Sequence, residues 1–225
     1  MRMRKAFGDG VERTFRAQEQ LLLVYRMWEE DEDGEGRNVL NPDALAEIKS
    51  IEDSVRELVT DWCLLDADTV TSTTDPDCIE ASDNVNTCVS YTGTCAVPIS
   101  AMNYFYPSLH SDGTISFDGQ GQDQVALETA LHVIQDLQLE SELFDIGFHG
   151  ESLSATYVVS VFQFGYPVKG FSSLGTQASY LQQRDLLKQF ITSLDQPLDE
   201  LREQSEVHMC VVCLCIYIYT LLLTI

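Results

Sequence analysis

Residues 157–171 have the sequence YVVSVFQFGYPVKGF, and this stretch decides the fold class. Residues 157–164 carry Val and aromatic side chains at both alternating positions, which predicts a strand buried on both faces, because a half-exposed strand alternates with polar residues. Gly165, Pro167 and Gly170 come next and predict a turn that leads out of the strand. Such a strand needs neighbouring strands and covering helices from the rest of the chain.

The flanking sequence predicts these partners. Residues 17–28 form a second apolar segment, and we expect it to lie beside the strand at 153–164 in one sheet. Asn41 is a favourable N-cap and Pro42 suits the first helical position of a long amphipathic helix that reaches Trp62. The other expected elements are a short helix between Pro98 and Pro107 and long helices at about 123–137 and 177–194, the last resuming after Pro197. The fold class is therefore α+β, with helices packed on a small sheet.

Composition limits the classes of partner. The 225 residues are 44% hydrophobic, which predicts a folded core, and 36 acidic against 13 basic residues give a net charge of -23. A surface this negative repels phosphate backbones, so we expect no nucleic-acid partner. Residues 1–16 form a basic segment that we expect to be disordered. It is not followed by the apolar run that a signal peptide requires. Its basic residues are Arg2, Arg4, Lys5, Arg13 and Arg16.

Four cysteines are concentrated in the polar, turn-rich stretch 63–95. Their number and setting favour a disulfide-stapled extracellular loop, whereas a zinc site usually shows a C-x2-C pair with a matching pair or histidines. Among the three possible pairings we favour Cys63 with Cys95 and Cys78 with Cys88. Three further cysteines, Cys210, Cys213 and Cys215, lie in apolar sequence, where cysteine packs as a small hydrophobe or accepts a lipid.

The C-terminal residues 209–225 carry no charge over 17 positions. A helix of that length spans about 25 Å, slightly less than the roughly 30 Å hydrocarbon core, so we expect a partial transmembrane segment at 207–225. A buried β-hairpin or core helix is the alternative, because the segment is rich in β-forming residues. The expected ectodomain then covers residues 17–206. A fragment, a truncated gene product and a tail-anchored protein all remain open.

No catalytic or metal motif is complete. The stretch 29–40 has acids spaced as in a calcium loop but ends on Leu40 in place of the bidentate Glu, and 108–119 fails similarly. The four histidines form no paired motif, and Ser152 lacks the G-x-S-x-G context of a hydrolase nucleophile. We therefore expect neither an enzyme nor a cofactor or metal site.

Several segments in order resemble a known family. LLLVYRMWEE, NVLNPDALAEIKSIEDSV, PISAMNYFYPS, DGTISFDGQG and ATYVVSVFQFGYPVKGF, with the cysteines between them, are similar to the first extracellular domain of Dispatched and Patched-like proteins. These proteins belong to the resistance-nodulation-division (RND) superfamily of membrane transporters. The likeness covers about residues 20–192. Its most specific elements are the segment from Cys95 through Pro98 and Ser100 into NYFYPS, the Gly119 turn, and the F-x-F-G-x-P-x-x-G run at 162–170. It implies a ferredoxin-like porter domain.

The resemblance also implies a function. Intact proteins of this kind move lipids, often sterol-linked ones, driven by ion gradients, so the chain would be a fragment that is not transport-competent alone. Residues 17–206 would be extracellular or lumenal, anchored to a membrane through the C-terminal segment, with a membrane lipid or sterol-linked ligand as partner in the intact protein. A homo-oligomer remains open. The alternative function is a secreted or tail-anchored acidic binding module for calcium or a protein partner.

Overall fold

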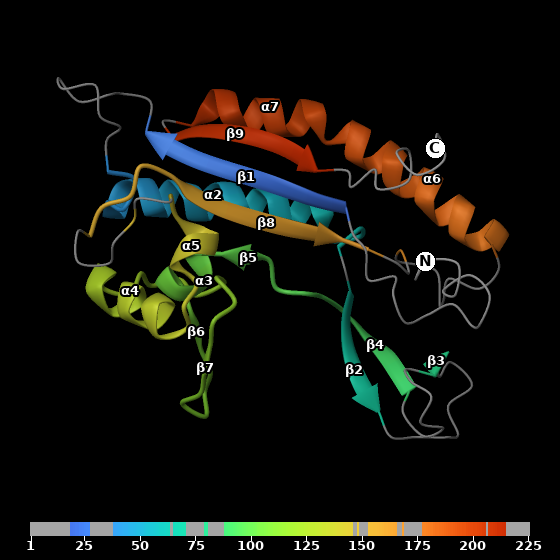
Figure 1. Cartoon of the computed structure of the whole chain (residues 1–225), viewed down its shortest axis with the longest axis horizontal. Helices are drawn as coiled ribbons and strands as arrows, with labels where there is room; N and C mark the ends of the chain where they lie inside the picture. Colours follow the sequence, from blue (N-terminus) through green and yellow to red (C-terminus); the bar gives the residue numbers. More distant parts are fainter. Residues whose placement is uncertain are drawn as a thin grey trace, which may run out of the picture.

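Strand β8 (Val158–Phe164) lies inside a four-stranded sheet of order β5-β8-β1-β9, in which every neighbouring pair is antiparallel (Figure 1). The other strands are β1 (Glu19–Met27), β5 (Ile99–Ser100) and β9 (Val207–Leu214). The structure is a computed structural model. It describes residues 19–27, 38–63, 65–70, 79–80, 88–145, 148, 153–165, 168, 177–205 and 207–214.

The two apolar segments are neighbours in one sheet, so that prediction is confirmed. β1 pairs with β8 in the register Leu21 with Phe162 and Tyr25 with Val158. Side chains alternate along a strand, so this register places these four residues on one face. All four are buried.

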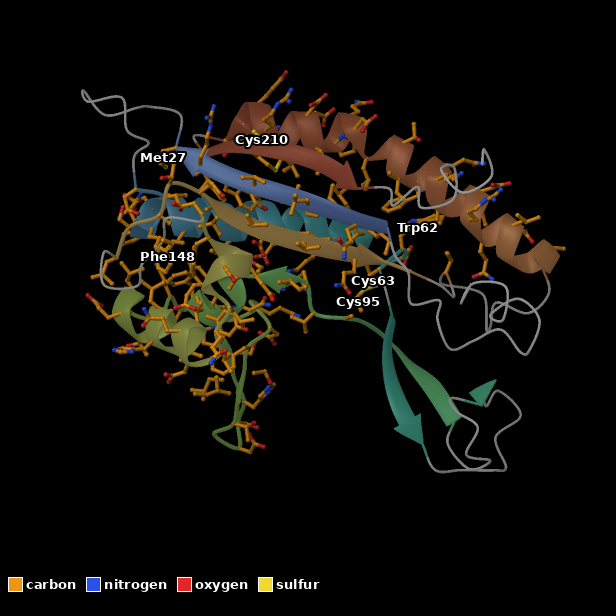
Figure 2. All side chains as sticks on the ribbon, viewed as in Figure 1. Met27, Trp62, Cys63, Cys95, Phe148 and Cys210 are labelled. Carbon is orange, nitrogen blue, oxygen red and sulfur yellow. A yellow bond between two sulfur atoms is a disulfide. The ribbon has the colours of Figure 1, made fainter. Side chains whose placement is uncertain are left out.

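Helices cover this face of the sheet (Figures 1 and 2). α2 (Pro42–Val59) begins at the predicted cap, where the side chain of Asn41 accepts a hydrogen bond from the backbone N–H of Ala44. α6 (Gln177–Ser193) packs on the same face, because Phe190 meets the buried ring of Phe164 edge to face at 5.8 Å. α7 (Asp195–Gln204) follows α6 after Leu194 alone. It thus begins before Pro197, which sits in the first turn, where its missing N–H costs nothing.

The prediction that β8 is buried on both faces is wrong. Its side chains alternate between buried and partly exposed along the whole strand, and Val159, Val161 and Gln163 belong to the partly exposed set. Leu22 and Val24 on β1 are partly exposed as well. The reason is that α2 and α6 both pack on the opposite face. The described part of the domain therefore has a half-exposed apolar sheet face.

Smaller elements lie beyond strand β5, close to α2. They are α3 (Met102–Phe105), the hairpin of β6 (Ser108–Leu109) and β7 (Ile115–Ser116), α4 (Leu127–Asp136) and α5 (Glu140–Leu143). α4 begins later than the expected residue 123, and Leu137 at its C-terminal end is 52% exposed. The hairpin projects away from the four-stranded sheet (Figure 1).

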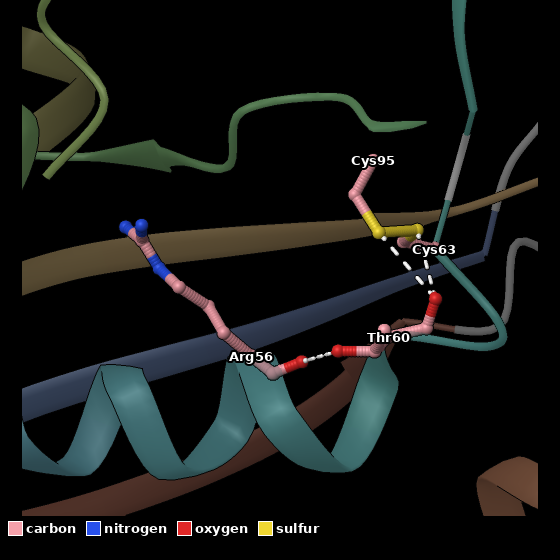
Figure 3. Close-up of a disulfide and its surroundings, with 4 residues drawn as sticks. All are labelled: Arg56, Thr60, Cys63 and Cys95. Carbon is pink, nitrogen blue, oxygen red and sulfur yellow. Dashed lines mark hydrogen bonds between the residues drawn. A yellow bond between two sulfur atoms is a disulfide. The ribbon is translucent and has the colours of Figure 1, made fainter. Parts of the chain in front are cut away.

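The cysteine-rich stretch contains a second sheet, which the sequence analysis did not predict. Its strands β2 (Leu65–Val70), β4 (Cys88–Cys95) and β3 (Ile79–Glu80) are antiparallel in the order β2-β4-β3. A disulfide joins Cys63 to Cys95 at the base of this ribbon, the pairing that the sequence favoured. Figure 3 shows both sulfur atoms beside the carbonyl oxygen of Thr60, at 3.5 and 3.6 Å. Cys78 lies outside the described residues, so its pairing with Cys88 stays a prediction.

The C-terminal boundary differs from the expected one. Val207–Leu214 is strand β9, paired with β1 from Met27 with Val207 to Gln20 with Leu214. Residues 209–214 thus belong to the sheet rather than to a membrane helix, and the domain extends to Leu214 at least. The β-forming residues of this segment pair with strand β1. Local hydropathy does not reveal this pairing. Residues 215–225 lie outside the described residues.

We predict that the Cys63–Cys95 disulfide supplies a large share of the domain's stability. It closes a loop with a sequence separation of 32, and on the chain-entropy model its loss costs about 3 to 4 kcal/mol. Replacing both cysteines by serine should lower the free energy of unfolding by this amount in urea titrations. Cys210→Ser is the matched control, because Cys210 is an exposed free thiol. Equal midpoints for the two variants would contradict the prediction.

Candidate functional site

Two of the predicted features lie next to each other in the structure, because Cys63 forms an isolated β-bridge with Phe164, the residue directly before Gly165. Cys63 and Cys95 form a disulfide at the end of α2, and Gly165 is a buried residue directly after β8. Pro167 and Gly170 lie outside the described residues. Within the described ranges, no three His, Cys, Asp or Glu side chains gather as metal ligands, and no helix has the length and apolar character needed to cross a membrane.

The structure shows a different cluster, centred on Glu52 of α2. Its side chain is fully buried on the apolar stripe of the helix, between Ile48 and Val55. One carboxyl oxygen, Oε1, accepts hydrogen bonds from Ser100 Oγ at 2.6 Å and Ser160 Oγ at 2.5 Å. Glu52 therefore joins α2 to the two strands β5 and β8 beneath it.

The other carboxyl oxygen of Glu52, Oε2, has fewer polar partners. Oε2 lies 3.6 Å from the guanidinium of Arg56, one helical turn further along α2. Among the described residues, Oε2 and Arg56 Nε are buried atoms without a hydrogen-bond partner. Such orphan groups are rare and costly in protein interiors, typically about 1 to 3 kcal/mol each. Two such atoms beside one buried carboxyl show that the polar groups of this cluster are incompletely hydrogen-bonded.

The cluster changes the proton affinity of its acids. Burial raises the pKa of Glu52 above its ordinary value, although the hydrogen bonds from Ser100 and Ser160 and the charge of Arg56 pull it down. Burial, and then the nearby Glu52 carboxyl, also raise the pKa of Tyr25 well above its usual range. The site can thus hold a proton on a carboxyl at a pH where an exposed glutamate is ionised.

Arg56 extends the cluster toward the β6–β7 hairpin. Its Nη1 donates to the carbonyl oxygen of Asp118 at 2.7 Å, and Nη2 donates to Asn103 Oδ1 at 3.5 Å. Asp118 in turn accepts a hydrogen bond from Ser108 Oγ at the start of the hairpin. Gly119 lets the backbone approach this group, since a Cβ there would lie 2.8 Å from both Arg56 Nη2 and Asn103 Oδ1. One buried network therefore connects the sheet, α2 and the base of the hairpin.

The sequence analysis missed this cluster, although two signals were present. Glu52 interrupts the apolar stripe of α2 with a charged side chain, and Ser160 interrupts the apolar run of β8. A charged residue on a helix and a serine in a strand are both common at solvent-exposed positions, so neither one alone indicates a buried cluster. Only the fold brings the two residues together, across 108 positions of the chain.

Comparisons with known proteins add no relative: no protein-family model matches the chain, and searches of curated proteins and of solved structures gave no significant match.

We predict that Glu52 makes stability fall as pH rises. Its pKa is raised in the folded state, so the folded protein binds more protons than the unfolded one above the ordinary value of 4.5. This contribution is complete below that pH and is lost as the pH rises through the folded-state pKa. The difference in unfolding free energy between the wild type and Glu52→Gln should therefore shrink as the pH rises from 4.5 through the folded-state pKa of Glu52.

Glu57→Gln, on the exposed side of the same helix, is the control for this experiment. Urea titrations at a series of pH values give both differences. Parallel pH profiles for wild type and Glu52→Gln would rule out a raised pKa at Glu52.

We also predict that Gly119→Ala costs about 1 kcal/mol more than Gly113→Ala. Both glycines have positive φ, +69° and +86°, so both substitutions carry the strain of a left-handed backbone. Only at position 119 does the new methyl group also press on Arg56 and Asn103, whereas position 113 faces open space. Equal losses of unfolding free energy would show that the close approach at Gly119 is unimportant.

Proposed function

We propose that this chain is the first extracellular, porter-like domain of a Dispatched/Patched-like protein of the RND superfamily. In the intact protein it would shape a path for a lipid or sterol-linked ligand, and it would catalyse no reaction itself. The sequence resemblance over residues 20–192 suggests this function, and the order of strands and helices supports it.

The observation that carries the proposal is the topology. Strands β1 and β5 run parallel with β8 between them and are connected through α2, while β8 and β9 run parallel with β1 between them and are connected through α6 and α7. Two interleaved split βαβ units are typical of a ferredoxin-like fold, so this topology supports the proposal. The cysteine ribbon, the hairpin and the small helices α3, α4 and α5 are then insertions into that fold.

The positions where the chain enters and leaves the sheet also support a membrane ectodomain. Gln20 near the start of β1 is paired with Leu214 at the end of β9, so the start of β1 and the end of β9 lie side by side (Figure 1). A domain inserted between two membrane segments needs this arrangement. The uncharged run 215–225 directly follows Leu214.

Two further features suit this location and role. The Cys63–Cys95 disulfide suits an oxidising extracellular or lumenal compartment. The half-exposed face with Leu22, Val24, Val159 and Val161 offers apolar surface to a lipid chain or to another part of an intact transporter.

We predict that the hairpin turn faces the lumen in membranes. The chain contains no Asn-x-Ser/Thr sequon, and Asp112→Asn creates one, Asn-Gly-Thr, at the exposed hairpin turn. The complete transcript carrying this change should yield a glycosylated protein that stays in the membrane after alkaline extraction. It should also encode apolar spans of about 20 residues on both sides of the domain.

A transcript that stops after Ile225, has no upstream span and releases the glycosylated protein into the medium would favour the secreted binding module instead. A photoactivatable cholesterol provides a second readout in the same membranes. Cross-links to peptides of β1 and β8 are expected for a lipid path along the sheet, and their absence would count against that path.

A further inference from the structure

The β6–β7 hairpin has one polar and one apolar face. Leu109 pairs with Ile115 across the hairpin, and Ser108 pairs with Ser116, so the two pairs point to opposite faces. On the polar face His110 Nε2 lies 2.7 Å from Ser116 Oγ. The apolar face is in solvent, since Leu109 is 75% exposed and Ile115 is 58% exposed.

Phe117 continues the apolar face toward the body of the domain. It lies two positions after Ile115, is 43% exposed, and its ring stands 5.4 Å from that of Tyr104. A two-stranded ribbon that turns its apolar face to water is unusual, because this face normally packs on a core. We call Leu109, Ile115 and Phe117 the apolar hairpin face.

Hydrogen bonds also hold the hairpin in place at its turn and at its base. In the turn, Asp112 Oδ1 accepts hydrogen bonds from both the N–H and the hydroxyl of Thr114. At the base, Asp118 accepts from Ser108 Oγ and from the side chain of Arg56. A projecting element that is already ordered loses little conformational entropy when it binds. These hydrogen bonds therefore favour the interpretation of the hairpin as a docking element rather than a loosely held loop.

The chain segment that contains the hairpin carries charges of one sign. Between Arg56 and Lys169 the sequence contains 17 Asp and Glu residues and no Lys or Arg. Arg56 itself is largely buried, with its side chain 17% exposed, and is bound to Asp118. In the hairpin itself, Asp112 is exposed in the turn, and Asp118 at the base is partly exposed. Any partner that covers the apolar hairpin face must therefore meet a negative rim.

We propose that the apolar hairpin face docks a basic polypeptide segment of a partner protein. Apolar side chains of that segment would pack on Leu109, Ile115 and Phe117, and its Lys or Arg side chains would pair with the surrounding acids. A second copy of this chain fits poorly, because it carries the same net charge of -23, and an anionic membrane is repelled for the same reason. The proposal does not depend on the proposed function, since an ectodomain and a secreted module would present the same hairpin.

Two short synthetic peptides with the same alternating Leu and Phe positions test the proposal, one with Lys and the other with Glu between them. Each is titrated by fluorescence anisotropy against the full chain at physiological ionic strength. The Lys peptide should bind and the Glu peptide should not. In the double variant Leu109→Ser, Ile115→Ser the Lys peptide should bind about tenfold more weakly, as is typical when anchor residues are truncated.

Leu137→Ser is the matched control, because Leu137 is an exposed leucine of the same acidic stretch. It should leave the affinity within about twofold, as expected for a position outside the contact. The variant Leu109→Thr, Ile115→Thr repeats the test with β-forming residues, in case the serine variant does not fold.

Three results would overturn the proposal. Unchanged affinity in both hairpin variants would show that charge alone binds the Lys peptide. Equal binding of the Glu peptide would remove the role of the acidic rim. In the third result, the hairpin variants abolish self-association or binding to phosphatidylcholine vesicles but leave Lys-peptide binding intact. This would assign the apolar hairpin face to a second copy or to lipid.

Discussion

The carboxyl of Glu52 is the constraint on which the arrangement of this domain depends. It sits in the middle of α2, fully buried, and its Oε1 holds the hydroxyls of Ser100 and Ser160 on two neighbouring strands. A buried carboxyl without partners is strongly unfavourable, so α2 must lie over these strands in one register. Hydrophobic packing alone tolerates small shifts of a helix along a sheet, whereas this contact does not.

The same residue connects the core to the surface. Through Arg56 the cluster reaches the backbone of Asp118, and through Asp118 it reaches the start of the β6–β7 hairpin. The hairpin has few apolar contacts of its own, because its apolar face is in solvent. Its position therefore depends on polar contacts at its base. A change of charge at Glu52 acts on the first member of this chain of contacts.

A second consequence concerns the sheet. α2 and α6 cover the same face, so the apolar side chains on the other face of β1 and β8 are only partly buried. The hairpin and this sheet face are two separate apolar surfaces on a strongly acidic chain. Apolar surface of this kind is typical of domains that work in contact with another molecule or with another part of their own protein.

The sequence by itself determined the local elements. The Asn41 cap with Pro42, the stripe of α2 and the apolar runs of β1 and β8 follow from residue types and short spacings. The sequence favours the Cys63–Cys95 pairing among three possible pairings. Only the tertiary structure decided which face of β8 is buried, that residues 207–214 form a strand, and that Glu52 meets Ser100 and Ser160. These depend on contacts between residues far apart in the chain, and local periodicity carries no information about such contacts.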